Sequence, residues 1–142
     1  MASLCGEFEH SIDPKGRMSF PNKFREILGA EFYLIMGYDN DYIAVYSPEE
    51  FDIYQEKLAT LKGTQGNNIR RKLLATADRQ IPDKQGRILV TEKLRKHAKI
   101  EKEVVVIGAG HRAEIWDKAV WDEFNDSISS EDMSDALSDM TL

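Results

Sequence analysis

A five-residue frame occurs twice in this chain, and its repetition restricts the possible folds more than any other feature. Residues 13–17 (Asp-Pro-Lys-Gly-Arg) and 83–87 (Asp-Lys-Gln-Gly-Arg) share Asp, Gly and Arg at the same places, 70 residues apart. In each frame the Asp side chain can accept hydrogen bonds from the following turn, and Gly permits a positive φ angle. Each frame therefore predicts a tight hairpin turn with an arginine at the start of the returning strand.

The repeat extends well beyond the two frames. Each frame is followed by an apolar run and then by a basic helical pattern. Further along, apolar and aromatic residues recur in pairs at the same offset of 70: Val45/Ile115, Tyr46/Trp116, Phe51/Trp121 and Tyr54/Phe124. Two copies in matching context indicate a duplicated fold.

Each half is predicted to contain a strand, the turn, a short strand, a short helix, a hairpin and a longer helix. A half of about 45 residues is too small to bury a stable core alone. We therefore expect an α+β fold with a pseudo-twofold, β-barrel-like core and helices packed outside. The expected division is 1–61 (first half), 62–78 (basic connecting helix or linker, with a polar loop over 63–68), 79–128 (second half) and 129–142 (acidic flexible tail).

Composition restricts the class of protein. No run of about 18 apolar residues exists, which argues against a membrane span, and the first residues lack the pattern of a secretion signal. Cys5 is the only cysteine and cannot form an internal disulfide, as expected in a reducing compartment. We expect a cytoplasmic protein.

The charge is unevenly distributed along the chain. The net charge is −6, but residues 101–142 carry −8, whereas the window 62–99 carries +8. A local basic surface decides whether phosphate is attracted, so an acidic total does not exclude nucleic acid. The window is also compatible with a solvated face beside an acidic tail.

The first turn carries the strongest candidates for DNA contact. Lys15 could contact phosphate, and Arg17 could contact phosphate or guanine. The alternative is that Arg17 pairs with an aspartate such as Asp13 and holds the turn. Asp13 is expected to support the turn, and Gly16 is expected to have only a backbone role.

The second turn carries the equivalent residues. Lys84 and Arg87 are also predicted to contact DNA, although a structural role is the stronger alternative for this pair. Asp83 and Gly86 are expected to support the turn in the same way as their first-half counterparts.

Catalysis finds no support in the sequence. The histidines His10, His97 and His111 are scattered without metal-ligand spacing, and only one cysteine is present. The segment Gly108-Ala109-Gly110 lacks the pattern of a phosphate-binding loop. We expect no catalytic residue, no metal, no cofactor and no small-molecule substrate.

Four segments of the chain resemble the MraZ family. They are residues 6–25, 83–90, 104–108 and 114–116, and the paired turn frames with Glu114-Ile115-Trp116 make the resemblance specific. Thr91 departs from the family pattern, which usually has proline there, and Pro82 before the second frame is unusual.

The resemblance implies a nucleoid-associated bacterial transcription regulator with two tandem AbrB-like halves. It implies a ring-shaped homo-oligomer that binds tandem repeats in double-stranded DNA, at the promoter of the division and cell-wall gene cluster containing its own gene. The alternative hypothesis is a ring-forming protein-interaction scaffold without specific DNA binding, in which the helices and the acidic tail recruit a protein.

Overall fold

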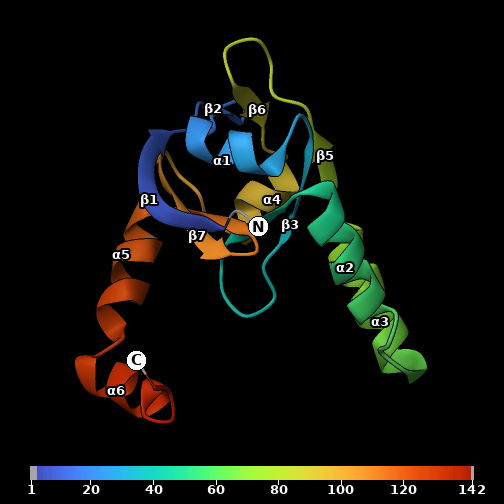
Figure 1. Ribbon diagram of the computed structural model, residues 1–142. Coiled ribbons are helices and arrows are strands. Elements are labelled where there is room, and N and C mark those ends of the chain that lie inside the picture. Colours follow the sequence, from blue (N-terminus) through green and yellow to red (C-terminus); the bar gives the residue numbers. More distant parts are fainter. Residues whose placement is uncertain (1–2, 142) are drawn as a thin grey trace.

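The computed structural model describes residues 3–141 and contains two antiparallel sheets with six helices around them (Figure 1). The larger sheet has six strands in the order β1-β7-β8-β4-β3-β5, and the smaller one pairs β2 with β6. The strands are β1 (Leu4–Ser11), β2 (Arg17–Ser19), β3 (Phe32–Met36), β4 (Ile43–Tyr46), β5 (Asp78–Gln80), β6 (Arg87–Leu89), β7 (Glu103–Gly110) and β8 (Ala113–Asp117). The helices are α1 (Asn22–Leu28), α2 (Pro48–Leu58), α3 (Gly63–Leu74), α4 (Glu92–His97), α5 (Lys118–Ser127) and α6 (Ser130–Leu137).

The two halves exchange strands in the larger sheet. The first strand of the first half, β1, pairs with β7 of the second half, and β5 of the second half pairs with β3 of the first. At the offset of 70 residues, β1 is equivalent to β5, β7 to β3 and β8 to β4. The order of equivalent strands is therefore the same when the sheet is followed from either edge. The predicted pseudo-twofold relation is therefore present, as interlocked halves. Pairing ends at β1 and β5 in an open sheet, so the predicted barrel-like closure is not confirmed.

The larger sheet separates two apolar cores. Strand side chains alternate between faces, and in β4 Ile43 and Val45 join one core while Ala44 and Tyr46 join the other. The first core also receives side chains from β2, β6, α1 and α4, and the second receives them from α2, α3 and α5. Consequently β2 and β6 lie on the opposite face of the sheet from α2, α3 and α5, as Figure 1 shows.

Local residues explain where the helices begin. The Ser47 side chain caps α2 by accepting the Glu50 N–H at 3.2 Å, and Thr91 caps α4 by accepting the Leu94 N–H at 3.3 Å. At the position equivalent to Thr91, Pro21 precedes α1 without a side-chain cap. The departure from the family pattern at Thr91 thus replaces a rigid proline with a hydrogen-bonding cap.

Two segments contain helix where the sequence suggested less order. Residues 63–68, predicted as a polar loop, form the first turns of α3, so that prediction is wrong. Arg70 explains the difference, because it donates to the carbonyl oxygens of Leu58 at 3.0 Å and Leu61 at 2.6 Å and so fixes α3 against the end of α2. The predicted acidic tail contains α6, which begins with a reciprocal capping box between Ser129 and Asp132.

Within residues 3–141, none of the helices has both the length and the apolar character needed to cross a membrane.

Candidate nucleic-acid interface

The first turn (residues 13–17) is held by one aspartate side chain. Asp13 Oδ1 accepts the backbone N–H groups of Lys15 and Arg17, both at 2.9 Å. Asp13 Oδ2 accepts the Arg17 Nε–H at 2.8 Å. Backbone bonds from Gly16 N to Asp13 O and from Asp13 N to Arg17 O, both 2.9 Å, close the hairpin. The predicted tight turn is confirmed, and the pairing of Arg17 with Asp13 is present.

The second turn (residues 83–87) repeats these bonds. Asp83 Oδ1 accepts the N–H groups of Gln85 and Arg87, both at 2.9 Å. Asp83 Oδ2 accepts the Arg87 Nε–H at 2.9 Å. The hairpin closes with Gly86 N to Asp83 O at 2.9 Å and Asp83 N to Arg87 O at 3.0 Å. The two turns therefore have the same internal construction.

The hydrogen bonds stabilise both aspartates in the ionised form. The backbone N–H of Arg17 donates to Asp13, and together with the Arg17 side chain it holds the pKa of that carboxyl below its usual range. The backbone N–H of Arg87 and its side chain lower the pKa of Asp83 in the same way. Both carboxylates are consequently charged at neutral pH, and each remains an acceptor for its arginine.

Each turn is also fixed by the other half of the chain. Val90 N donates to Gly16 O at 2.7 Å, and Phe20 N donates to Gly86 O at 3.0 Å. The Arg95 guanidinium, held by Val90 O at 3.1 Å, donates to Pro14 O at 3.3 Å in the first turn. Neither turn is therefore a free loop, because each one rests on the opposite half.

Both turns require glycine at the fourth position. Gly16 has a φ angle of 92° and Gly86 one of 76°, where side chains cause strain. A Cβ atom on Gly16 would lie 2.4 Å from the Val90 carbonyl oxygen. On Gly86 it would lie 2.7 Å from a terminal nitrogen of Arg25. Gly16 therefore lets the first turn approach the backbone of the second half, whereas Gly86 makes room for the Arg25 side chain of the first half.

The paired strands β2 and β6, here called the ribbon, carry both turn arginines on one exposed face. Met18 and Ile88 pair at the centre and point into the core. Arg17 lies opposite Leu89, and Arg87 lies opposite Ser19, and these four residues are exposed. The strands are antiparallel, so each turn enters the ribbon at a different end. Duplication thus places two equivalent arginines on one small surface.

The two arginines keep part of their hydrogen-bonding capacity. The Arg17 side chain is 51% exposed and that of Arg87 is 45% exposed. Both use Nε for their aspartate, and among residues 3–141 no hydrogen bond occupies their terminal nitrogens. Each guanidinium is therefore oriented at one edge while its outer edge can still donate.

The lysines of the two turns occupy shifted positions. Lys15 and Lys84 are exposed, and neither forms an ion pair within the part of the chain that the structure describes. Lys84 lies in the loop before β6, which projects at the top of Figure 1. Beside the first turn, an open hollow of about 730 Å³ is lined by Arg17, Arg87 and Lys102, among others. This end of the molecule therefore offers several cationic donors close together.

Nothing in the described residues suggests a metal centre. Across residues 3–141, no three His, Cys, Asp or Glu side chains are grouped so that they could hold a metal ion.

Sequence reasoning missed the role of Arg25 and Arg95. Sequence analysis gave the basic helical pattern after each frame no part in the turns, but Arg95 supports the first turn, and Arg25 lies against Gly86 in the second. Each also donates through Nε to a carbonyl of its own half, Phe20 O at 3.2 Å for Arg25. Their spacing of 70 residues was the available signal, because residues repeated with the turns can be expected to serve them.

Comparison with known proteins connects this geometry to a family. The family model described as "MraZ protein, putative antitoxin-like" matches residues 4–69 and 73–142. A relative from Thermoanaerobacter sp. (strain X514) is 46% identical over 143 residues, covering 98% of this chain and 99% of the relative. One from Finegoldia magna is 41% identical with the same coverage. One from Pediococcus pentosaceus is 43% identical over 122 residues, covering 84% and 85%. Each is named "Transcriptional regulator MraZ".

Proposed function

The chain belongs to the MraZ family, and on that premise we propose that it regulates transcription by binding double-stranded DNA through the ribbon and its two turns. One observation carries the proposal. Two equivalent turns with the same Asp, Gly and Arg are brought onto one exposed face by the pairing of β2 with β6, and each presents a half-exposed arginine and a lysine. The names of the relatives support the regulatory role.

The geometry of the turns suits recognition of DNA. The aspartate fixes the arginine through Nε, so the side chain loses less conformational freedom on binding. The outer edge of the guanidinium can then donate to a phosphate, or to O6 and N7 of guanine in the major groove. Lys15 and Lys84 would add phosphate contacts at the two ends of the ribbon. A two-stranded ribbon is one of the elements that the major groove admits.

Affinity in this proposal comes from repetition. One ribbon is a small surface, so a single copy would bind weakly. A ring of copies facing tandem promoter repeats would raise the effective concentration of each ribbon after the first one binds. We propose the promoter of the division and cell-wall gene cluster containing its own gene as the target. The protein would act in the cytoplasm at the nucleoid, without a cofactor, a small-molecule substrate or an enzymatic activity.

Fluorescence anisotropy with the full chain tests the proposal. A labelled duplex from upstream of the gene is competed with a scrambled duplex of equal length at physiological salt. We expect the wild type to prefer the upstream duplex and Arg17→Ala to lose that preference while remaining folded. Arg71→Ala is a matched control, because Arg71 is an exposed arginine on α3, away from the ribbon.

Two results would contradict the proposal. One is a folded wild-type protein that does not distinguish the upstream from the scrambled duplex. The other is an Arg17→Ala variant that keeps the preference at full strength. If Arg17→Ala unfolds, Arg17→Lys and Lys15→Gln can replace it, because both retain a long polar side chain at an exposed position.

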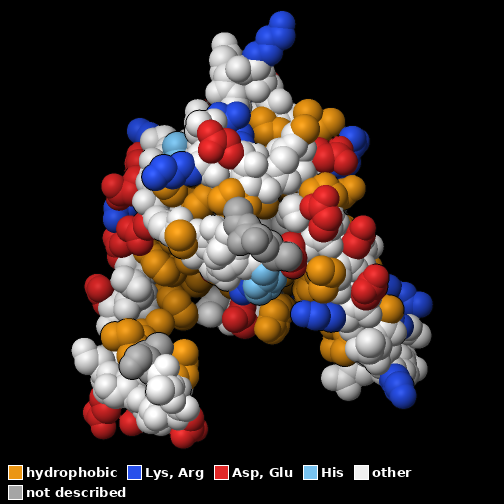
Figure 2. Space-filling model, viewed as in Figure 1, with side chains coloured by type: hydrophobic (Ala, Val, Ile, Leu, Met, Phe, Trp, Pro, Cys, Tyr) orange, Lys and Arg blue, Asp and Glu red, His pale blue; other side chains and the backbone are white. Residues whose placement is uncertain are grey.

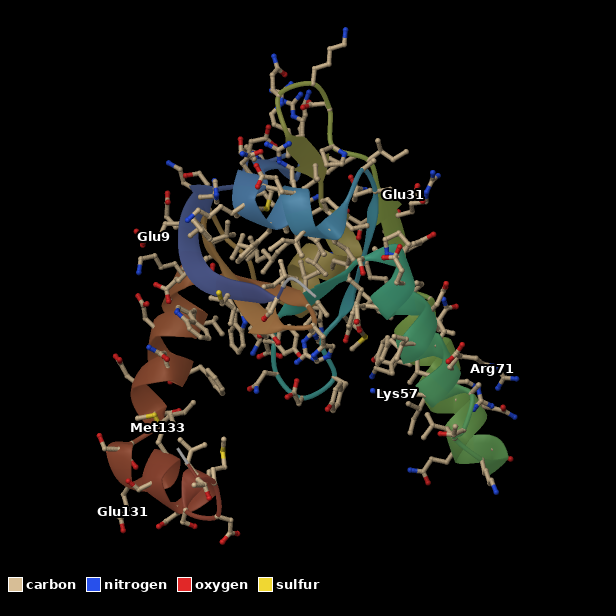
Figure 3. All side chains as sticks on the ribbon, viewed as in Figure 1. Glu9, Glu31, Lys57, Arg71, Glu131 and Met133 are labelled. Atoms are coloured by element: carbon tan, nitrogen blue, oxygen red, sulfur yellow. The ribbon has the colours of Figure 1, made fainter. Side chains whose placement is uncertain are left out.

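A protein-interaction scaffold remains the second candidate, because α6 has an exposed apolar side. Met133 and Leu137 lie one helical turn apart and are 49% and 43% exposed. Neither belongs to the two apolar cores formed by the described residues. Figure 3 places Met133 and Glu131 on α6, across the molecule from Arg71 on α3. A surface of this kind fits contact with another protein, including a second copy.

Substitution on α6 separates the two candidates. Met133→Glu with Leu137→Glu should reduce oligomer mass in mass photometry if this face joins copies. Loss of assembly that also weakens binding to repeated, but not single, DNA sites would favour the regulator. Wild-type assembly without any DNA preference would favour the scaffold.

A further inference from the structure

The two ends of the ribbon differ in one chemical respect. Arg17 lies opposite Leu89, whereas Arg87 lies opposite Ser19. Ser19 and Leu89 are equivalent positions of the two halves, so the pseudo-twofold relation fails here. Leu89 is 49% exposed, although the residues beside it on this face are polar. One arginine therefore has an apolar neighbour, and the other has a hydroxyl.

A second pair of positions differs in the same direction. Ile81, just before the second turn, is 60% exposed, and its first-half equivalent is Ser11. Figure 2 shows apolar side chains beside the loop that precedes β6. Neither Ile81 nor Leu89 belongs to the two cores of the described chain. The fold does not account for these two exposed apolar side chains.

Charge does not distinguish the two ends. Each turn contains one lysine, one arginine and one aspartate. Both turns should therefore attract phosphate equally, and the difference that remains concerns what they contact besides phosphate. Within the major groove, the apolar feature that a base pair presents is the C5 methyl group of thymine.

The Leu89 N–H donates to the side chain of Gln80, the residue before Ile81, at 3.0 Å, so Ile81 lies near Leu89 in the chain's fold. We propose that Leu89, with Ile81 nearby, contacts a thymine methyl group beside the base or phosphate bound by Arg17. The two ends of the ribbon then contact different bases within one promoter repeat, so the ribbon binds DNA in one orientation. This inference rests on the proposed function, because it requires the ribbon to lie in the major groove. Leu89 is a specificity-determining residue in this account, and Ser19 provides no equivalent contact at the other end.

Removal of the methyl group alone tests the inference. The upstream duplex is prepared once with thymine and once with deoxyuridine, which lacks only the C5 methyl. We expect wild-type protein to bind the deoxyuridine duplex about fourfold more weakly, the effect of one buried methyl-sized group. Leu89→Ser copies the first-half residue and should bind both duplexes equally. Leu89→Asn, which has nearly the shape of leucine but a polar end without methyl groups, provides a second variant with the same expectation.

The reciprocal variant is the matched control. Ser19→Leu places an apolar side chain opposite Arg87, so its preference for thymine should rise above that of the wild type. Any effect of deoxyuridine on duplex shape or stiffness would persist in Leu89→Ser, which separates it from a direct contact.

The outcomes distinguish this inference from the proposed function. Absence of promoter preference in the wild type would contradict the proposed function itself. Promoter preference with equal binding of the thymine and deoxyuridine duplexes would overturn the inference alone. A Leu89→Ser variant that keeps the thymine preference would also overturn it. A Leu89→Ser variant whose oligomer mass in the absence of DNA differs from that of the wild type would overturn it as well, because Leu89 would then belong to a contact between proteins.

Discussion

At the turns the two halves make the same hydrogen bonds, whereas at the centre of the six-stranded sheet they place different residues at equivalent positions. The Nε–Oδ2 distances in the two turns are 2.8 and 2.9 Å. In the sheet, Ala44 pairs with Glu114 on the pseudo-twofold axis, although these two positions are equivalent. The repeat is therefore strict at the exposed turns and relaxed in the interior.

The asymmetric interior is a polar cluster built from both halves. Arg112 and Glu114 form an ion pair at 2.8 Å with side-chain exposures of 17% and 7%. Glu114 also accepts the Trp116 Nε1–H at 2.9 Å, and the Tyr42 hydroxyl accepts from Arg112 at 3.0 Å. Tyr42 and Arg112 are themselves equivalent positions. The interior can diverge where each buried group finds a partner in either half, whereas both turns keep the same Asp, Gly and Arg.

The largest expected effect comes from breaking the asymmetric cluster. Arg112→Ala leaves the buried Glu114 carboxylate without its cation and should lower the free energy of unfolding by about 3–5 kcal/mol. Urea unfolding at fixed protein concentration measures the change. The paired variant Arg112→Met with Glu114→Leu removes both charges and should cost much less. A loss below about 1 kcal/mol for Arg112→Ala alone would show that the pair is not needed.

The next effect compares the two glycines directly. Gly16→Ala should lower the free energy of unfolding by about 3 kcal/mol, and Gly86→Ala should lower it by about 1 kcal/mol. Both variants place alanine at a positive φ angle, which strains the backbone, but only Gly16 also lies against rigid backbone. The Cβ on Gly16 would meet the Val90 carbonyl, whereas the one on Gly86 would meet the end of the Arg25 side chain. Thermal unfolding of both variants measures the difference. Equal losses would mean that the two turns pack equally tightly.

A smaller effect concerns the helix that follows each turn. Thr91→Ala removes the cap of α4 and should cost about 1 kcal/mol in the free energy of unfolding. Thr91→Pro makes the second half resemble the first at this position and should restore part of that stability, because the φ angle that proline fixes matches the −61° of Thr91 at the N-cap. If Thr91→Ala is as stable as the wild type, the 3.3 Å bond to the Leu94 N–H contributes nothing.

The smallest effect is the pH dependence of the turns. The folded-state pKa of Asp13 is lowered, so its contribution to stability is complete above its ordinary pKa of about 3.9. That contribution is lost as the pH falls through the lowered folded-state value. Carboxyl titration by NMR should show Asp13 and Asp83 titrating at similar, low pH. Asp13→Asn should remove one of the two titrations and leave the other in place; an unshifted Asp13 would contradict the hydrogen bonding described.

The repeated parts of the fold could be predicted because they repeat. The shared frame at residues 13–17 and 83–87 predicted both turns, and the aromatic pairs at the same offset predicted equivalent hairpins and helices. The pairing of β3 with β4 and of β7 with β8 follows from the predicted hairpins, but the pairings between the two halves could not be predicted. Alternation in β1 shows that the strand is half buried, but it does not show that the neighbouring strand comes from the other half.

Long-range polar contacts explain most of what sequence reasoning missed. Gly63, Gly66 and the asparagines between residues 63 and 68 have low helix propensity, and Arg70 binding to carbonyls at the end of α2 overrides it. Likewise Arg95 looks like a surface residue of a short helix until the first turn is placed beside it. The contact of the turns with DNA stays a prediction.

The dependence of DNA binding on salt tests the central claim that both turns lie on DNA. Binding of the upstream duplex is measured from low to high salt for the wild type, Lys15→Gln and Lys84→Gln. Each variant removes one cation from one turn, so the slope of log affinity against log salt should decrease by about 0.9 in both. A slope that is unchanged in Lys84→Gln but reduced in Lys15→Gln would contradict the account, because only the first turn would then contact the phosphates.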